Sequence, residues 1–99
     1  MIEHIVINTI EYLERAYFLS KSLTISVYDE GGLWVYQNEE YDLCGWHKDK
    51  DMALVAFCED FDFAYKEFAE EEDDKLHSSA QEYKRELLKL VDQIQYKDL

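Results

Sequence analysis

The sequence predicts an α+β domain: an antiparallel sheet of three or four strands packed against a long helix, with a second, C-terminal helix antiparallel to the first. Residues 1–46 are rich in β-branched and aromatic side chains, whereas residues 49–99 are rich in Ala, Glu, Lys and Leu. The chain of 99 residues has no proline and three glycines, so no stretch has the composition of a linker. We therefore expect one domain over residues 1–99, with a sheet-rich part in 1–46 and a helical part in 49–96.

A β-hairpin gives the clearest local signal. Residues 23–28 alternate between apolar and polar side chains, and residues 33–37 follow as the partner strand. Gly31 and Gly32 lie in the turn between them, where glycine permits positive φ without steric cost. After a second turn, residues 41–46 form a third strand, so we expect a meander with one buried face.

The first twenty residues allow two interpretations. Asn8-Thr9-Ile10-Glu11 has the pattern of a capping box, and apolar residues follow at helical spacing, which favours a helix over residues 9–19. A strand through residues 16–19 is the alternative.

A long helix is expected to begin near Lys50, with an acid at residue 49 or 51 as its N-cap. Repulsion among the five acids of residues 70–74 frays its end. The apolar stripe consists of Leu54, Phe57, Phe61, Ala64, Tyr65 and Phe68.

A second capping box, Ser78 with Gln81 or Ser79 with Glu82, predicts the start of the final helix. Its apolar positions continue to Ile94, so we expect it to run to about Tyr96.

The charge is strongly negative, with 23 Asp and Glu against 10 Lys and Arg and a net charge of −13. Direct nucleic-acid binding and an anionic membrane surface are excluded, because both need clustered cations. Nine acids between Glu59 and Asp74 face a single base, Lys66, and this concentration favours a basic protein partner. The candidate partner-binding patch is Glu67, Glu70, Glu71, Glu72, Asp73 and Asp74. The alternative is a solvated helix end that serves only solubility.

Aromatic and apolar residues indicate a second surface, for a homodimer or another partner. The final helix is apolar at near-heptad spacing, and Trp34 and Tyr36 share one face of the sheet. The alternative for Trp34 and Tyr36 is that the early helix covers them. The candidate interface residues are Trp34, Tyr36, Tyr65, Phe68, Tyr83, Leu87, Leu90 and Ile94.

Metal binding and catalysis are not expected. Cys44 and His47 form one short-spaced pair, whereas a zinc site needs four ligands, and Cys58 and His77 do not form a second pair. Negative surroundings disfavour a reactive thiolate, and no serine lies in a nucleophile motif. We therefore expect no catalytic residue, no metal and no cofactor.

Two cysteines are too few for a disulfide framework, and the longest apolar run, residues 52–58, is too short to span a membrane. The N-terminus lacks the pattern of a signal peptide. These features predict a cytoplasmic protein with free thiols and no membrane association.

Residues 20–68 resemble the HicB-like antitoxin domain at the level of supersecondary structure. The Gly31-Gly32 turn, the strand end at Gly45, the cap at Asp49 and the helix opening at Ala53-Leu54 carry this resemblance. It implies a meander-plus-helix module that sequesters a small basic toxin. His47 and Lys48 depart from the family pattern, and residues 75–99 do not resemble an appended DNA-binding domain.

The function that these features favour is a non-catalytic acidic protein-interaction module, antitoxin-like, with a basic protein partner. The alternative from another class is a structural homo-oligomeric subunit, and a small hydrolase or metal enzyme is the least favoured reading.

Overall fold

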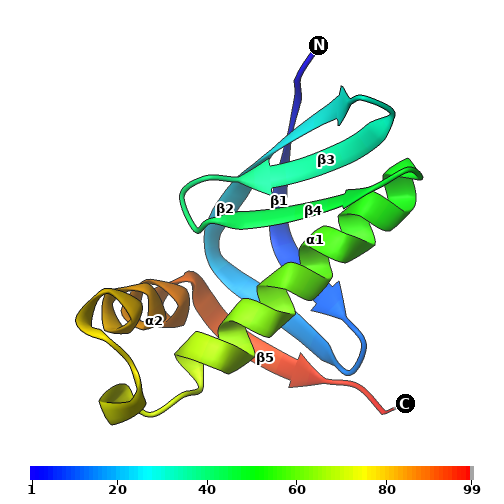
Figure 1. Cartoon of the computed structure of the whole chain (residues 1–99). Helices are drawn as coiled ribbons and strands as arrows, with labels where there is room; N and C mark the ends of the chain where they lie inside the picture. Colours follow the sequence, from blue (N-terminus) through cyan, green and yellow to red (C-terminus); the bar gives the residue numbers. More distant parts are fainter. Residues whose placement is uncertain (99) are drawn as a thin grey trace.

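The computed structural model describes residues 1–98 and confirms the α+β class. Four strands pair antiparallel in chain order, and a fifth strand from the C-terminal end pairs with β2 (Figure 1). The long helix α1 lies across the sheet. The strands are β1 (Glu3–Tyr12), β2 (Arg15–Glu30), β3 (Leu33–Asn38), β4 (Leu43–His47) and β5 (Val91–Tyr96).

The expected helix over residues 9–19 is wrong, because this segment is a hairpin of β1 and the start of β2. Tyr12 pairs with Arg15 across a tight turn in which Leu13 has φ 48°. A register shift between Ile7 and Thr9 interrupts the pairing of the two strands. Ile10 is fully buried, and pairing with the long β2 outweighs the local capping-box pattern.

The hairpin predicted from residues 23–37 and the following strand are confirmed. Tyr28 pairs with Val35 across the β2–β3 turn, where Gly31 and Gly32 have φ 61° and 87°. β4 then pairs with β3, opposing Gly45 to Tyr36. The strand β2 is long enough to serve two further partners: its second half pairs with β3, and its first half pairs with β5.

Helix α1 (Lys50–Ala64) begins as expected. Asp49 is the N-cap, and its carboxylate accepts a hydrogen bond from the Met52 N–H at 3.0 Å. The helix continues as a π-helical turn, η1 (Tyr65–Ala69), and ends before the acidic run. A short 3₁₀ turn, η2 (Asp73–Lys75), follows.

Helix α2 (Ser78–Leu90) differs from expectation at both ends. His77 is the N-cap, with no side-chain capping bond, and the Gln81 amide instead donates to the carbonyls of Asp73 and Leu76. The helix stops at Leu90 because residues 91–96 form β5 on the edge of β2. Helical spacing up to Ile94 does not reveal this pairing, which joins residues more than 70 positions apart in the chain.

The core lies between the sheet and α1. Ala53, Phe57 and Phe61 of α1 are fully buried, and they pack in one cluster with apolar side chains of β1–β4 and with Leu87 and Leu90 of α2. Gly45 allows α1 to approach β4 closely, since a Cβ atom on Gly45 would lie 2.1 Å from the backbone nitrogen of Phe57.

A buried carboxylate ties α1 to the first hairpin. Asp62 accepts a hydrogen bond from the Tyr17 hydroxyl at 2.6 Å and pairs with Lys66 at 3.0 Å. The Arg15 guanidinium donates to the same Tyr17 oxygen, so the hydroxyl is bonded on both sides. Burial and the Asp62 carboxylate both raise the pKa of Tyr17 above its ordinary value. The charge on Asp62 is compensated within the fold.

Replacing Gly45 with alanine should destabilise the protein severely. The new methyl group would meet the backbone of α1 rather than a movable side chain, so strand and helix must separate. We expect Gly45→Ala to lower the free energy of unfolding by about 3 kcal/mol or more, measured by urea denaturation. Gly31→Ala is the control: its Cβ meets nothing within 4 Å, and only the positive φ costs about 1 kcal/mol. Equal losses in the two variants would contradict the close approach.

Candidate functional site

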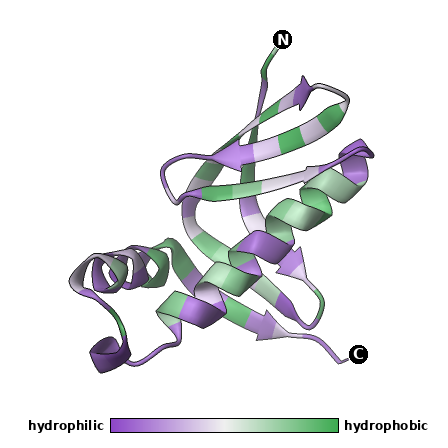
Figure 2. Ribbon diagram, viewed as in Figure 1, coloured by the Kyte–Doolittle hydropathy of each residue, from purple (hydrophilic) through white to green (hydrophobic). Residues whose placement is uncertain are grey.

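The outer face of α1 carries large apolar side chains. Met52, Val55 and Phe63 are 46%, 44% and 59% exposed, although Phe57 and Phe61 on the opposite face already fill the core. Figure 2 shows apolar residues along α1 in contrast to the hydrophilic segment that follows it. A helix at the surface of a globular protein normally has a polar outer face. The outer face of α1 is therefore a candidate interaction surface.

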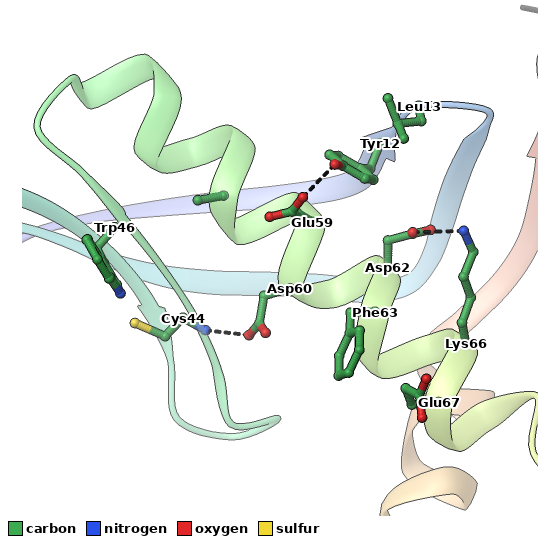
Figure 3. Close-up of a pocket in the computed structure, with 11 residues that line it drawn as sticks. Tyr12, Leu13, Cys44, Trp46, Glu59, Asp60, Asp62, Phe63, Lys66 and Glu67 are labelled. Carbon is green, nitrogen blue, oxygen red and sulfur yellow. Dashed lines mark hydrogen bonds and ion pairs between the residues drawn. The ribbon is translucent and has the colours of Figure 1, made fainter.

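The part of this face that contains Phe63, but not Met52 or Val55, forms the floor of a groove of about 710 Å³. One wall comes from β4, with Cys44 and Trp46, and the other comes from the β1–β2 turn, with Tyr12 and Leu13 (Figure 3). Trp46 and Leu13 are each 61% exposed. We call this feature the α1 groove. Its floor residues are Ala56, Glu59, Asp60, Asp62, Phe63, Lys66 and Glu67.

Three carboxylates give the α1 groove its negative charge. Glu59 accepts a hydrogen bond from the Tyr12 hydroxyl at 2.6 Å, and Asp60 accepts one from the Cys44 N–H at 3.0 Å. Each bond uses one oxygen of the carboxylate and fixes the side chain against a groove wall. Glu67 has no ion-pair partner in residues 1–98.

Lys66 is the cation that lines the groove, and its charge is already compensated. Its ammonium lies 3.0 Å from Asp62 and 3.2 Å from Glu14. Hydrogen bonds to these two carboxylates raise the pKa of Lys66. The pair with Asp62 leaves Glu59, Asp60 and Glu67 as the excess charge of the α1 groove.

Burial and nearby acids raise the pKa of two groups close to the α1 groove. The pKa of the Cys44 thiol is raised, first by burial and then by Asp60 and Asp42. Burial and the same two acids raise the pKa of Tyr83 to about 12. Asp42, Asp60, Phe63 and Tyr83 line a second hollow of about 250 Å³ that shares Asp60 and Phe63 with the α1 groove.

The structure divides the acidic patch expected at residues 67–74. Glu67 lines the α1 groove. Glu70 binds Arg15 through both oxygens, at 3.0 and 3.1 Å, and Asp73 pairs with Lys84 at 2.9 Å. Glu72 pairs with Lys75 at 3.9 Å, and the Glu71 carbonyl accepts from Lys84. Three of the six carboxylates of the expected patch are therefore paired with the chain's own cations, whereas those of Glu67, Glu71 and Asp74 have no ion-pair partner among residues 1–98.

The expected interface residues hold the core together. Tyr36, Tyr65, Leu87 and Leu90 are buried, and the other four, Trp34, Phe68, Tyr83 and Ile94, pack against the same core. The Trp34/Tyr36 face is covered, as the alternative stated, but by α1 rather than by an early helix. In residues 1–98 the exposed large aromatic side chains are Trp46, Phe63 and Tyr96, and none of them is among the expected interface residues. Gly45 is the sequence signal for Trp46: because residue 45 faces α1, the side chain of the neighbouring Trp46 is turned away from the core and stays exposed.

Cys44 and His47 do not lie in a metal-like cluster. Among residues 1–98, no three His, Cys, Asp or Glu side chains are arranged to hold a metal ion. His47 Nδ1 accepts a hydrogen bond from the Asp49 N–H at 2.9 Å, and Cys58 is half-buried in α1.

Comparison of the chain with family models, with curated proteins and with solved structures finds no match. In the described part of the chain, no helix has the length and apolar character needed to cross a membrane.

Neutralising Asp60 should lower the pKa of the Cys44 thiol, because one of the charges that disfavour the thiolate is removed. Asn in place of Asp60 keeps an oxygen to accept the Cys44 N–H. We expect Asp60→Asn, in a Cys58→Ala background, to react faster with an aromatic disulfide reagent at pH 8. The pKa should remain above its ordinary value, since burial persists. Glu82→Gln, on the exposed side of α2, is the charge-matched control and should leave the rate unchanged. A rate in Asp60→Asn equal to the parent would contradict this electrostatic coupling.

Proposed function

We propose that the protein is a non-catalytic interaction module that binds a basic protein partner through the α1 groove. One observation carries this proposal: exposed apolar side chains and uncompensated carboxylates occur together on the outer face of α1. Eight of the ten Lys and Arg side chains already pair with carboxylates of the same chain. A partner therefore has to supply the cations that balance the α1 groove.

The two kinds of groove residue have different roles in this proposal. Glu59, Asp60 and Glu67 attract a cationic partner over several ångströms and increase its rate of association. Phe63 and Trp46 lose water only on contact, so they determine mainly the rate of dissociation.

A small basic toxin is the partner that the resemblance to HicB-like antitoxins implies, and it belongs to the class that the α1 groove favours. In this proposal the protein acts in the cytoplasm, where Cys44 and Cys58 remain free thiols.

A homodimer is the second candidate, and the edge of the sheet favours it. Among residues 1–98, β1 pairs only with β2 and leaves its other edge free, and Val6 is 61% exposed on this ten-residue strand. A second copy can extend the sheet by pairing its own β1 with this edge. The net charge of −13 opposes this association at low salt.

The proposal predicts an association rate that depends steeply on salt. The partner is first isolated by co-purification from the native host and identified, and it should have a basic isoelectric point. We expect its association rate constant to fall about tenfold or more between about 50 and 500 mM salt, because screening shortens the attraction. The dissociation rate constant should change by less than about threefold. Stopped-flow kinetics measures both.

A charge-matched pair of variants locates the attraction. The triple variant Glu59→Gln, Asp60→Asn, Glu67→Gln should slow association at least about fivefold. The control removes three exposed acids away from the groove: Glu82→Gln, Asp92→Asn and Asp98→Asn. An association rate constant that does not depend on salt, or that falls equally in both variants, would contradict binding through the α1 groove.

A further inference from the structure

We infer that the α1 groove binds an arginine side chain of the partner, with the guanidinium on the indole of Trp46 and paired with Asp60, and with an apolar neighbour of that arginine against Phe63. This inference rests on the proposed function, and it specifies the chemistry that the α1 groove recognises.

The fold already contains one arginine bound in this way. The Arg15 guanidinium lies 5.9 Å from the ring centre of Tyr17 and 5.3 Å from that of Tyr96. Both of its terminal nitrogens bond to the carboxylate of Glu70, at 3.0 and 3.1 Å. Rings and a carboxylate together thus hold a planar cation within this protein.

Two lysines repeat the combination of a ring and an acid. Lys50 lies 4.6 Å from the ring centre of Trp34 and 3.0 Å from Glu3. Lys21 is the third example: its ammonium lies 5.5 Å from the ring centre of Tyr41 and 2.9 Å from the carboxylate of Glu40.

The α1 groove presents the same combination to the outside. Asp60 lies between Trp46 and Phe63 in Figure 3, and all three line the groove. In the described part of the chain, no Lys or Arg lies over the ring of Trp46 or Phe63. The nearby cation, Lys66, is held by Asp62 and Glu14 instead. We therefore expect a cation from another molecule to bind between the ring of Trp46 and the carboxylate of Asp60.

Arginine fits this surface better than lysine does. A guanidinium is planar, so it can stack on the exposed indole while its edge donates two hydrogen bonds to one carboxylate. It is also less strongly hydrated than an ammonium, which favours a site that is half apolar. The volume of about 710 Å³ accommodates the arginine together with an apolar neighbouring side chain against Phe63.

Three tripeptides test the inference with the intact chain. The probes are acetyl-Leu-Arg-Leu-amide and the same peptide with Lys or with citrulline in the centre, since citrulline keeps the planar shape but has no charge. Each is titrated into ¹⁵N-labelled protein at low salt. We expect the Arg peptide to shift the indole N–H of Trp46 and the amides of residues 59–63, while the indole of Trp34 serves as an internal reference. The Lys peptide should bind at least about threefold more weakly, and the citrulline peptide at least about tenfold more weakly.

Variants assign the binding to individual groups. Trp46→Thr and Asp60→Asn should each weaken binding of the Arg peptide about fivefold or more. Val6→Thr removes an equally exposed apolar side chain from β1, and Glu82→Gln removes a charge from α2, so both should bind within about twofold of the parent. Equal binding of the Arg and citrulline peptides, or shifts centred on residues 70–74, would overturn the inference.

The experiments distinguish a failure of this inference from a failure of the proposed function. If the partner protein binds with the expected salt dependence but Trp46→Thr leaves its affinity unchanged, arginine recognition at Trp46 is wrong and the interaction module stands. If the Arg peptide binds as expected but no basic protein partner is found, the proposed function is wrong and the α1 groove is still an arginine site.

Discussion

The contact between α1 and β4 at Gly45 determines both the core and the surface of this protein. Because residue 45 has no side chain, the backbone of Phe57 can lie against the strand, and Phe57 and Phe61 then fill the space above the sheet. The same contact brings Asp60 within 3.0 Å of the Cys44 N–H. The outer face of α1 and the exposed Trp46 thereby become two sides of one groove.

The acidic composition serves two purposes in this structure. One group of carboxylates stabilises the fold locally: Glu70 holds Arg15, Asp73 holds Lys84, and the buried Asp62 joins Tyr17 and Lys66. Exposed pairs of this kind contribute little to stability on their own, but Arg15 is largely buried and links β2 to the end of the long helix. The other group, in the α1 groove, is held in place by donors that do not neutralise it. Its self-repulsion is a cost of folding that binding of a cation would relieve.

Local sequence patterns were sufficient for part of the fold. The Gly31-Gly32 hairpin, the third strand and the Asp49 cap are all determined by residues close together in the chain. Residues 91–96 were misassigned because β5 pairs with the start of β2, which lies more than 70 residues earlier in the chain. Residues 9–19 were misassigned for a different reason: the end of β1 and the start of β2 form a local hairpin, and a capping-box pattern in the same segment indicated a helix. Part of the candidate site was also predictable from local composition. Charge density identified the region around Glu67. The exposure of Phe63 depends on which face of α1 meets the sheet, and the exposure of Trp46 depends on which face of β4 meets α1.

Site-specific photo-crosslinking in the native host tests the central claim most directly. A benzophenone amino acid replaces Phe63 in the α1 groove in one variant and Val6 on β1 in another, and both positions are about equally exposed. The account predicts that the Phe63 variant crosslinks to one basic protein, that the crosslinked peptide contains arginine, and that adding salt before irradiation reduces the yield. Crosslinks that form only from the Val6 variant, to a second copy of this chain, would contradict the account.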